Sequence, residues 1–520
     1  MSLYGQIGLP GCPDPINIQR LDLLPIPQVR RMMKVGVACD LNHFHSLGEK
    51  LESKKTDLRS SICSYIPQSD LDQFADADSD FNEDEHDLAL NVDSAEQIAD
   101  LLYKKLGVGL GMQLKRTKGG TRLSTGKKQL ETLKRQHPII PLILRYREYS
   151  KLINTFSSTL PKQAVLHKEG KHCFCGVRHF GDHHRIHGTI NTTRTIPGRL
   201  SMRSPNLQQI PSRTKMGREV RKGFCAAPHC KLVARDFSQL HLRLLAWLGD
   251  EKVMQQIFAE NGDIHVRTAM RAFKIDNPKL VDKASQRDPS KTAIFLTVYG
   301  GGALTLLDTL IVNFALAACE CVGDSIYKDG KCIVCGGSMQ KQTPDWLTLE
   351  WCDQLIKETY ALYPGVPNYF AVQHYRASQY GITWCPFGRV RWVPEVHSCH
   401  ARVVQAGLRQ GGNHPIIGCE AGMVKVAQAR VEDLVFSKWR RRGVHAEAVI
   451  PVHDELVAEV GEEWTEEVGE EMGQEMSRAL EDVETGKSYS SVEIKVDGEC
   501  TNRWVKKQED DEVVDWRAVA

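Results

Sequence analysis

The sequence has no run of about 18 apolar residues, the length that is typical of a membrane-spanning helix. Its first residues, MSLYGQIGLPGCPDP, lack both the basic segment and the apolar segment of a secretory signal. They are also not rich in Arg or Ser, as organelle transit peptides are. We therefore expect a cytoplasmic protein that has no membrane partner.

The sequence also lacks the cysteine density of a disulfide-stabilised protein, because 16 cysteines are spread over 520 residues. Several of them form close pairs, namely Cys173 with Cys175, Cys319 with Cys321, and Cys332 with Cys335. Such pairs favour a reducing compartment, in which the thiols stay reduced or bind metal.

Net charge is nearly absent, at +2, but the charged residues are clustered. Residues 70–87 are strongly acidic, and basic clusters follow at 115–122, 127–135, 213–222 and 438–442. Basic patches in a near-neutral chain are typical of a protein that binds a polyanion on one surface, although each patch alone fits solvated surface equally well. The acidic stretch fits either an irregular loop or a partner site.

Two aspartates end predicted strands and are about 220 residues apart. Asp236 follows a short apolar strand and precedes a helical pattern at 238–248. Asp454 lies in a predicted tight turn between two strands within 446–460, and Pro451 places the first strand at an edge or a bulge. Side chains at such junctions point into clefts, but two unrelated turn aspartates would give the same pattern.

A helical pattern that begins at Asp288-Pro289 carries Arg287, Lys291, Phe295 and Tyr299 at intervals of four residues. At about 100° per residue, these four side chains lie along one helix face. The face has two cations near its start and two aromatic rings further on. This order suits a nucleotide, with the triphosphate at the cationic end and the sugar and base against the rings. An ordinary amphipathic helix is the alternative, but its apolar face would not begin with Arg and Lys.

Five motifs follow one another along the chain: TRTIPGRLSMRSPNLQQIP (193–211), DFSQLHLRLLAWLGDE (236–251), GDIHVRTA (262–269), RDPSKTAIFLTVYG (287–300) and PVHDELV (451–457). In this order and spacing they resemble the polymerase module of the bacterial DNA polymerase I family (family A). Weaker similarity extends from about residue 25 to the C-terminus. The resemblance implies an α+β fold shaped like a right hand, with an antiparallel sheet in the palm and helical fingers and thumb.

The resemblance also implies a division of the chain into regions. These are an N-terminal extension (1–30), a palm or thumb base with the acidic loop (31–95), a thumb (96–185), a palm segment (186–237), fingers (238–444) and a second palm segment (445–520). Little of the chain is left for an exonuclease or a 5′ nuclease domain. We therefore expect no intrinsic proofreading, and a compact viral, phage, mobile-element or repair enzyme in the cytoplasm of its cell or host.

The activity implied by the resemblance is template-directed DNA polymerisation, in which two metal ions promote transfer of a dNTP to a primer 3′-hydroxyl. Asp236, Asp454 and the carbonyl of Phe237 would hold the two Mg²⁺ ions, for which Mn²⁺ can substitute, and Lys291 would be catalytic. The expected partners are primer–template DNA, dNTPs and replication accessory proteins. The chain is expected to be a monomer.

The resemblance assigns further contacts to substrate. Arg287, Lys291 and His265 would bind the triphosphate, Phe295 the sugar, and Tyr299 the region of the template base. Gln239 and His241 would also contact the incoming nucleotide. Contacts to the primer–template minor groove would come from Arg199, Asn206, Gln208, Asn413 and His453. Hydrogen bonds in that groove can check base-pair shape without reading sequence.

The chain departs from the family pattern at three places. His241 replaces a Glu that helps to exclude the 2′-hydroxyl of ribonucleotides, Ile417 replaces a Gln, and Leu296-Thr297 replaces a segment with Gly. Two alternatives follow: a polymerase with relaxed sugar or template choice, such as a reverse transcriptase-like enzyme, or an inactive primer–template-binding protein.

A Cys-rich insertion at 314–343 separates helices of the expected fingers. The spacing of Cys319, Cys321, Cys332 and Cys335 is typical of a tetrahedral Zn²⁺ site, and free thiols are the alternative. A structural Zn²⁺ would fold an insertion too small for its own core. A second cluster of Cys and His at 173–187 fits either a metal site or a polar hairpin.

Overall fold

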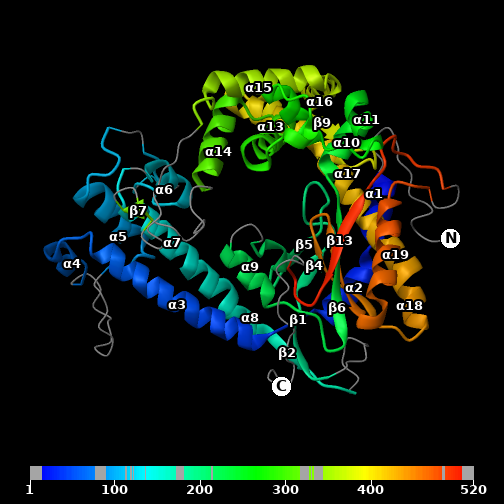
Figure 1. Ribbon diagram of the computed structural model, residues 1–520, viewed down its shortest axis with the longest axis horizontal. Helices are drawn as coiled ribbons and strands as arrows, with labels where there is room; N and C mark the ends of the chain where they lie inside the picture. The colour runs from blue at the N-terminus through cyan, green and yellow to red at the C-terminus, as the bar shows by residue number, and fades with distance from the viewer. Residues whose placement is uncertain are drawn as a thin grey trace.

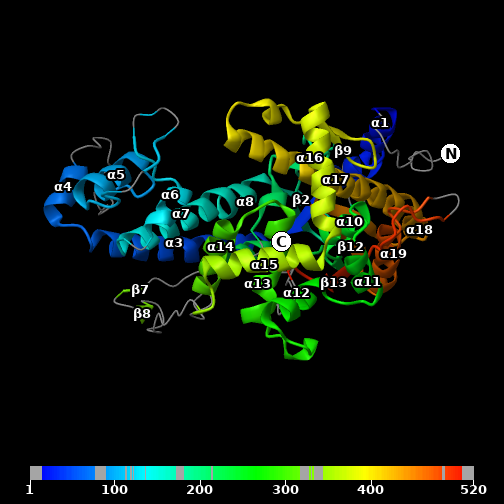
Figure 2. The same ribbon diagram turned by 90° about the horizontal axis from the view of Figure 1, so that it is seen from above.

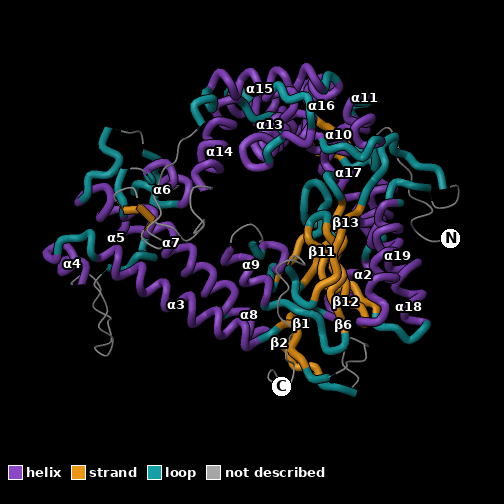
Figure 3. Tube along the Cα trace, in the orientation of Figure 1, coloured by secondary structure: helices purple, strands orange, loops and turns teal. Residues whose placement is uncertain are grey.

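A computed structural model of the chain describes residues 15–75, 90–111, 114–117, 120, 122–134, 136–170, 181–211, 215–316, 327–328, 331–332, 344–482 and 486–505. Figure 1 shows three groups of elements: a sheet with flanking helices, a group of helices above it, and a long helical arm. The view from above places the arm on one side of the sheet (Figure 2). Strands are concentrated in the sheet, and helices make up most of the other two groups (Figure 3). Among the described residues, no helix is both long and apolar enough to span a membrane.

The central sheet is antiparallel, with strand order β11-β12-β6-β13. Its strands are β6 (Cys230–Phe237), β11 (Ala446–Val452), β12 (Glu455–Gly461) and β13 (Val496–Thr501). The predicted pair of strands around residues 453–454 is therefore confirmed. Pro451 lies in the edge strand β11, which is one of the two positions predicted for it. The register of this strand shifts between Ala448 and Ile450, just before the proline.

Helices cover the central sheet and are tied to it by their apolar faces. Helix α2 (Ile26–Val35) packs on β11, and α19 (Thr465–Ser477) packs on β6 and β13. The other elements of this group are α1 (Pro15–Leu23), α9 (Lys215–Lys222), α17 (Ala401–Arg430), a π-helix (Val431–Phe436), α18 (Ser437–Arg441) and 3₁₀ turns at Leu207–Gln209 and Glu462–Trp464. Short strands form a sheet of β1 (Val37–Cys39), β3 (His183–Ile186) and β2 (Ala164–His167), and a pair of β4 (Thr189–Asn191) and β5 (Ser201–Arg203).

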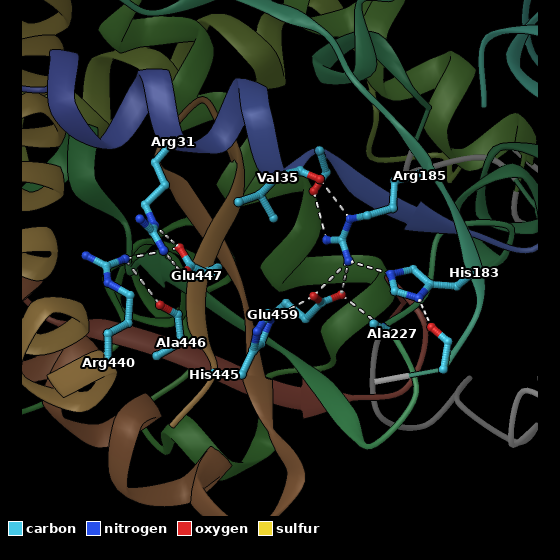
Figure 4. Close-up of polar contacts among 12 residues, drawn as sticks. Arg31, Val35, His183, Arg185, Ala227, Arg440, His445, Ala446, Glu447 and Glu459 are labelled. Carbon is cyan, nitrogen blue, oxygen red and sulfur yellow. Dashed lines mark hydrogen bonds and ion pairs between the residues drawn. The ribbon is translucent and has the colours of Figure 1, made fainter. Parts of the chain in front are cut away.

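Two buried glutamates on the central sheet form ion pairs with neighbouring elements (Figure 4). Glu447 on β11 and Glu459 on β12 are directly opposite each other in the antiparallel register. Like charges in that position repel, so each carboxylate needs a cationic partner. Glu459 accepts a hydrogen bond of 2.9 Å from Arg185 of β3, and Glu447 pairs with Arg31 of α2 and with Arg440 of α18. The paired charges thus fix β3, α2 and α18 against the sheet.

The helical arm has a hydrophobic core of its own, in which residues such as Ile62, Leu102, Leu130 and Ile143 are fully buried. Its long helices α3 (Leu41–Cys63) and α7 (Ile139–Leu152) pack against each other. Smaller elements are α4 (Gln68–Ala75), α5 (Ala95–Ala99), α6 (Lys127–Leu133), α8 (Thr159–Gln163) and π-helices at Asp100–Lys105 and Ile153–Ser157. Helix α4 covers the start of the acidic stretch, and residues 76–87 of it lie outside the described residues.

The third group consists mainly of helices and contains a smaller core around Ala293, Leu306, Leu310 and Cys352. Its helices are α10 (Leu240–Leu248), α11 (Lys252–Ala259), α12 (Ile264–Phe273), α13 (Asp288–Val298), α14 (Ala303–Leu316), α15 (Leu349–Leu362) and α16 (Gly365–Tyr380). A π-helix (Lys283–Arg287), 3₁₀ turns at Pro278–Leu280 and Pro394–His397, and the hairpin of β9 (Ile382–Trp384) with β10 (Val390–Trp392) also belong to it. A further short hairpin pairs β7 (Tyr327–Lys328) with β8 (Lys331–Cys332).

Candidate active site

The end of β6 and the β11–β12 turn bring two aspartates next to each other. Asp236 is the cross-strand partner of Glu455, and Asp454 is the residue before Glu455. The backbone N–H of Phe237 donates a hydrogen bond of 3.4 Å to the carbonyl oxygen of Asp454. On the other side of β6, Asp497 of β13 also lies opposite Asp236. Antiparallel pairing thus gathers carboxylates that are far apart in the sequence.

The environment of these carboxylates disfavours their ionised form. Partial desolvation by the surrounding protein is the main cause that raises the pKa of Asp236 to about 7, and the charges of Asp454, Glu455 and Asp497 add to it. Part of the Asp236 side chain nevertheless remains exposed to solvent. Burial and the charge of Glu420 raise the pKa of Asp454. Repulsion of this kind is relieved by a bound cation, and hard carboxylate oxygens are the ligands that Mg²⁺ prefers. The carboxylates of Asp236 and Asp454 therefore fit a divalent metal ion.

Two residues beside the aspartates have a left-handed backbone conformation. Gln239 precedes α10 with φ of 51°, and His453 lies in the β11–β12 turn with φ of 57°. For residues other than Gly this conformation costs about 1–3 kcal/mol and is most frequent at functional sites. His453 is exposed, and the side-chain oxygen of Gln239 is buried with no hydrogen-bond partner in the described part of the chain.

Helix α13 begins at Asp288 with Pro289 in its first turn, as predicted. Lys291 is exposed one turn later, and its ammonium nitrogen lies 6.0 Å from the centre of the Phe295 ring. Tyr299 is the residue that ends the helix. The residues predicted to share one face thus extend from the start of α13 to its end.

The N-terminus of α12 lies against the cationic end of α13. Asp263 caps α12 by accepting a hydrogen bond of 2.7 Å from the backbone N–H of His265. The same carboxylate binds the guanidinium of Arg287 at 2.6 Å. The ring of His265 lies 5.7 Å from that of Phe295, and burial lowers the pKa of His265 to about 4. This imidazole is therefore neutral at pH 7 and can donate a hydrogen bond without adding charge.

Four polar side chains meet between α10, α13 and α17. The buried carboxylate of Glu420 accepts hydrogen bonds from His241 Nε2 at 2.7 Å and from Arg199 Nε at 3.0 Å. The other ring nitrogen of His241, Nδ1, is hydrogen-bonded to the hydroxyl of Tyr299. Burial opposes ionisation of Glu420, but His241 and Arg199 outweigh it and hold its pKa below the ordinary value. His241 therefore links the end of α13 to the segment that carries Arg199.

The other residues predicted to contact nucleic acid are distributed around the β11–β12 turn and α17. Gln208 donates a hydrogen bond of 2.8 Å to the carbonyl oxygen of Pro451, three residues before Asp454. Asn206 precedes the 3₁₀ turn that contains Gln208, and Asn413 lies within α17. The side-chain oxygens of both asparagines are buried and have no hydrogen-bond partner among the described residues.

Sequence reasoning missed Glu420 and Asp497. Asp497 lies on the last strand, where the sequence gives no local pattern that points to Asp236. Glu420 did leave a sequence signal, because it is the only acidic residue between Glu395 and Glu432 and stands among apolar and small residues. A lone acid in such a segment is buried only when it is paired.

The described residues contain one further group with the spacing of metal ligands, formed by Cys230, His445 and Glu459. Glu459 already accepts hydrogen bonds from Arg185 and His445, both at 2.9 Å (Figure 4). Because the Arg185 guanidinium neutralises this carboxylate, we interpret the group as a structural ion pair. The predicted zinc ligands Cys319, Cys321 and Cys335 lie outside the described residues, as does the side chain of Cys332.

Comparison with known proteins identifies the family. The profile of DNA polymerase family A matches residues 69–320 and 339–506. DNA polymerase I of Deinococcus radiodurans is 31% identical over 78% of this chain and 35% of its own length. The thermostable DNA polymerase I of Thermus filiformis is 31% identical over 68% of this chain and 36% of its own length. The chain thus spans about a third of the length of these relatives.

A solved structure shares the fold. The POL domain of Pol1 from M. smegmatis, in complex with DNA primer-template and dNTP, gives a TM-score of 0.69 at 24% identity, and the likeness covers 93% of this chain and 70% of that chain. The expected α+β, right-hand architecture is thereby confirmed. The profile match includes Asp236, Asp454 and all of α13. The chain belongs to DNA polymerase family A.

Proposed function

We propose that this chain is a template-directed DNA polymerase, which adds dNTPs to the 3′-hydroxyl of a primer. The proposal rests on one arrangement, in which the Asp236–Asp454 pair lies beside a helix face that is cationic at one end and aromatic at the other. His241 connects the two parts, since it contacts Tyr299 and lies five residues after Asp236. The arrangement offers a site for a metal ion, a triphosphate and a base next to one another.

In this proposal, side chains of α12 and α13 bind and orient the incoming nucleotide. Lys291 and Arg287 donate charge-assisted hydrogen bonds to phosphate oxygens. The neutral ring of His265 donates a hydrogen bond to another phosphate oxygen. Phe295 and Tyr299 present their rings to the sugar and the base. A nucleotide bound in this way has its reacting phosphate near Asp236.

Asp236 and Asp454, with the carbonyl of Phe237, would hold the divalent metal ions that family A polymerases use. When bound, Mg²⁺ or Mn²⁺ neutralises the charge that develops on the attacking and leaving oxygens. Both aspartates must be ionised to act as ligands, so Asp236 has to release the proton that its raised pKa retains.

We further propose that Arg199, Asn206, Gln208, Asn413 and His453 contact the minor groove of the primer–template. Gln208 donates a hydrogen bond to Pro451, and His453 is exposed in the turn that follows, next to Asp454, which supports a place for these two residues near the reacting primer end. Side-chain donors at this place can monitor the shape of any base pair without a preference for sequence. This suits an enzyme that copies any template.

Relaxed choice of sugar or template is the second candidate function, and it is motivated by His241 and Ile417, which depart from the family pattern. An inactive binding protein is disfavoured, because Asp236, Asp454, Arg287 and Lys291 are all retained.

Primer extension tests the proposal. The purified chain is incubated with a labelled DNA primer on DNA or RNA templates, with dNTPs or rNTPs, and with Mg²⁺ or Mn²⁺. We expect extension of the DNA-templated primer by dNTPs and no extension by Asp454→Ala. If the wild type extends no primer under any of these conditions, the polymerase proposal is wrong. Normal extension by Asp454→Ala would contradict only the metal assignment.

Several narrower expectations remain proposals for direct measurement. These are the division into N-terminal extension, thumb, palm and fingers, the structural Zn²⁺ in the insertion, the absence of proofreading, the monomeric and cytoplasmic state, accessory partners, and a viral or phage source. Elemental analysis that finds no zinc would exclude the metal. Shortening of a labelled primer without dNTPs would show an intrinsic exonuclease. The relatives compared above are bacterial.

A further inference from the structure

The carboxylate of Glu420 is the acidic centre of the cluster that it forms with Arg199, His241 and Tyr299. Its side chain is 2% exposed, and it is bound by both Arg199 and His241. A buried carboxylate with two such partners holds both of them in place, because moving either one takes a hydrogen bond from a desolvated charge. Glu420 therefore fixes the positions of two residues that border the proposed substrate site.

His241 is held from both sides of its ring. In the neutral tautomer, Nε2–H donates to Glu420 and Nδ1 accepts from the hydroxyl of Tyr299. The rings of His241 and Tyr299 are nearly perpendicular, at 79°, with centres 6.0 Å apart. Because both ring nitrogens are already bonded, the imidazole is fixed in orientation and has no free polar atom to offer to a ligand.

The position of the His241 ring relative to the substrate follows from its two neighbours, Asp236 at the end of β6 and Tyr299 at the end of α13. Asp236 lies five residues before His241 and marks the reacting phosphate. Tyr299 ends α13, whose opposite end carries the proposed triphosphate ligands Arg287 and Lys291. The sugar lies between the phosphates and the base of a nucleotide, so it would lie along α13 between Lys291 and Tyr299, next to the fixed ring of His241 that is bonded to Tyr299.

We propose that Glu420 is a positioning residue for sugar selection, which acts by holding His241 against the 2′ position of the incoming nucleotide. This inference rests on the proposed polymerase function. A ribonucleotide would bury its 2′-hydroxyl against a ring whose nitrogens are both occupied, and an unpaired buried hydroxyl is unfavourable. Loss of Glu420 would free Nε2 of His241 and the guanidinium of Arg199 to pair with that hydroxyl.

Nucleotide binding without turnover gives the most direct test. A primer with a 3′-dideoxy end is annealed to its template, and the Kd values of the matched dNTP and rNTP are measured for the ternary complex. The ratio of the rNTP Kd to the dNTP Kd should fall by about 10- to 100-fold in Glu420→Ala. Glu420→Gln, which keeps the shape and one acceptor, should give an intermediate ratio.

A double-mutant cycle decides whether Glu420 acts through His241. If Glu420 acts through His241, then His241→Ala alone lowers the ratio of the rNTP Kd to the dNTP Kd. The double variant with Glu420→Ala then has nearly the same ratio as His241→Ala. If the two effects add in full, the positioning role is wrong. The inference is also wrong if the ratio of the rNTP Kd to the dNTP Kd stays at the wild-type value in both Glu420→Ala and Glu420→Gln.

Glu459→Gln is a matched control for Glu420→Gln. Glu459 is also buried and also bound by one arginine and one histidine, Arg185 and His445, but it touches none of the proposed substrate residues. Thermal unfolding of both variants measures the general cost of losing a buried carboxylate. The ratio of Kd values should change only in the Glu420 variants, and an equal change in Glu459→Gln would contradict a role in sugar selection.

The two proposals fail in different ways. A chain that binds dNTP in the ternary complex but never extends a primer disproves the polymerase function and leaves the sugar-selection ratio measurable. A chain that extends primers with an unchanged ratio in the Glu420 variants disproves only the role of Glu420. A wild type that binds neither dNTP nor rNTP disproves both.

Discussion

The carboxyl of Asp236 is partly desolvated and is repelled by neighbouring carboxylates, and this has a consequence for stability that can be measured. Its pKa of about 7 in the folded protein is above the ordinary value of about 4. Ionisation therefore costs folding free energy, and this cost grows as pH rises from about 4 to 7. By linkage this shift corresponds to about 4 kcal/mol, but solvent screens the exposed side chain of Asp236, so the realised cost is about 1 kcal/mol. Asp236→Asn should therefore raise the free energy of unfolding of the metal-free protein by about 1 kcal/mol at pH 8, which is about 1 °C in unfolding temperature, and by less at pH 5.

Divalent cations provide the control for this stabilisation. Added Mg²⁺ should stabilise the wild type, because it neutralises the repelling carboxylates. It should therefore reduce the difference in unfolding temperature between the wild type and Asp236→Asn. The scans are run by calorimetry in chelator and in excess Mg²⁺. A variant that is less stable than the wild type at pH 8 in chelator would contradict the repulsion, whatever its activity. The same substitution should abolish primer extension.

The exposed ammonium group of Lys291 gives a prediction in which folding is not involved. Its side chain lies over the Phe295 ring and makes no ion pair in the described part of the chain. Lys291→Ala should therefore leave the unfolding temperature within about 1 °C of the wild type, since exposed substitutions change stability little. It should lower kcat/KM for dNTP incorporation by about 100- to 1,000-fold, the usual effect of removing a donor to developing negative charge. Lys291→Arg is the matched control, because it keeps the cation and should lose less.

Among the elements, the opposed glutamates on β11 and β12 form ion pairs with β3, α2 and α18. Burial raises the pKa of Glu459, but Arg185 and His445 more than reverse this and hold it well below the ordinary value. The group thus contributes stability that is present above pH 4–5 and is lost as pH falls below that range. Arg185→Ala should destabilise the protein by about 3–5 kcal/mol, because it leaves a buried carboxylate unpaired.

Chemical denaturation of the single variant Arg185→Ala and of a double variant separates the cost of an unpaired carboxylate from the cost of lost packing. Arg185→Met paired with Glu459→Leu replaces the ion pair by apolar groups and should recover most of the stability that Arg185→Ala loses. Between pH 7 and acid pH, the double variant should lose less of its free energy of unfolding than the wild type loses. Equal losses in the single and double variants would show that packing, and not the unpaired charge, determines the cost.

Elements defined by local sequence could be predicted, and contacts between distant segments could not. The strand before Asp236, the strand–turn–strand around Asp454 and the start of α13 each have signals within a few residues, and the structure has all of them. The bond between His241 and Glu420 joins residues 179 positions apart, and no periodicity connects them. Their pairing depends on how α10 and α17 pack, which follows from the whole core and not from either helix alone.

At the scale of the whole molecule, the structure separates basic clusters that looked equivalent in the sequence. Arg441 and Arg442 of the cluster at 438–442 are exposed. Two other cations of this cluster are used within the protein, because Lys438 pairs with Glu471 and Arg440 pairs with Glu432 and Glu447. By contrast, α6 on the helical arm exposes Lys127 and Lys128 to solvent. The weak pair of Lys127 with Glu131, at 3.9 Å on an exposed helix, costs little to break. Exposed lysines of this kind are available to a polyanion, whereas Lys438 and Arg440 are already paired.

Salt dependence of primer–template binding tests this difference. Binding through phosphate contacts releases counterions, so affinity should fall by about 1,000-fold between 50 and 200 mM salt if six or more contacts form. Replacing Lys127 and Lys128 by Ala should weaken binding and lower the slope of log K against log salt by about 2, if both side chains reach phosphates. Lys438→Ala is the matched control and should leave the slope unchanged, because its partner is Glu471. A fluorescence anisotropy titration at several salt concentrations measures all three slopes. If Lys438→Ala lowers the slope as much as the α6 variant, the basic surface does not lie where the exposed lysines of the arm place it.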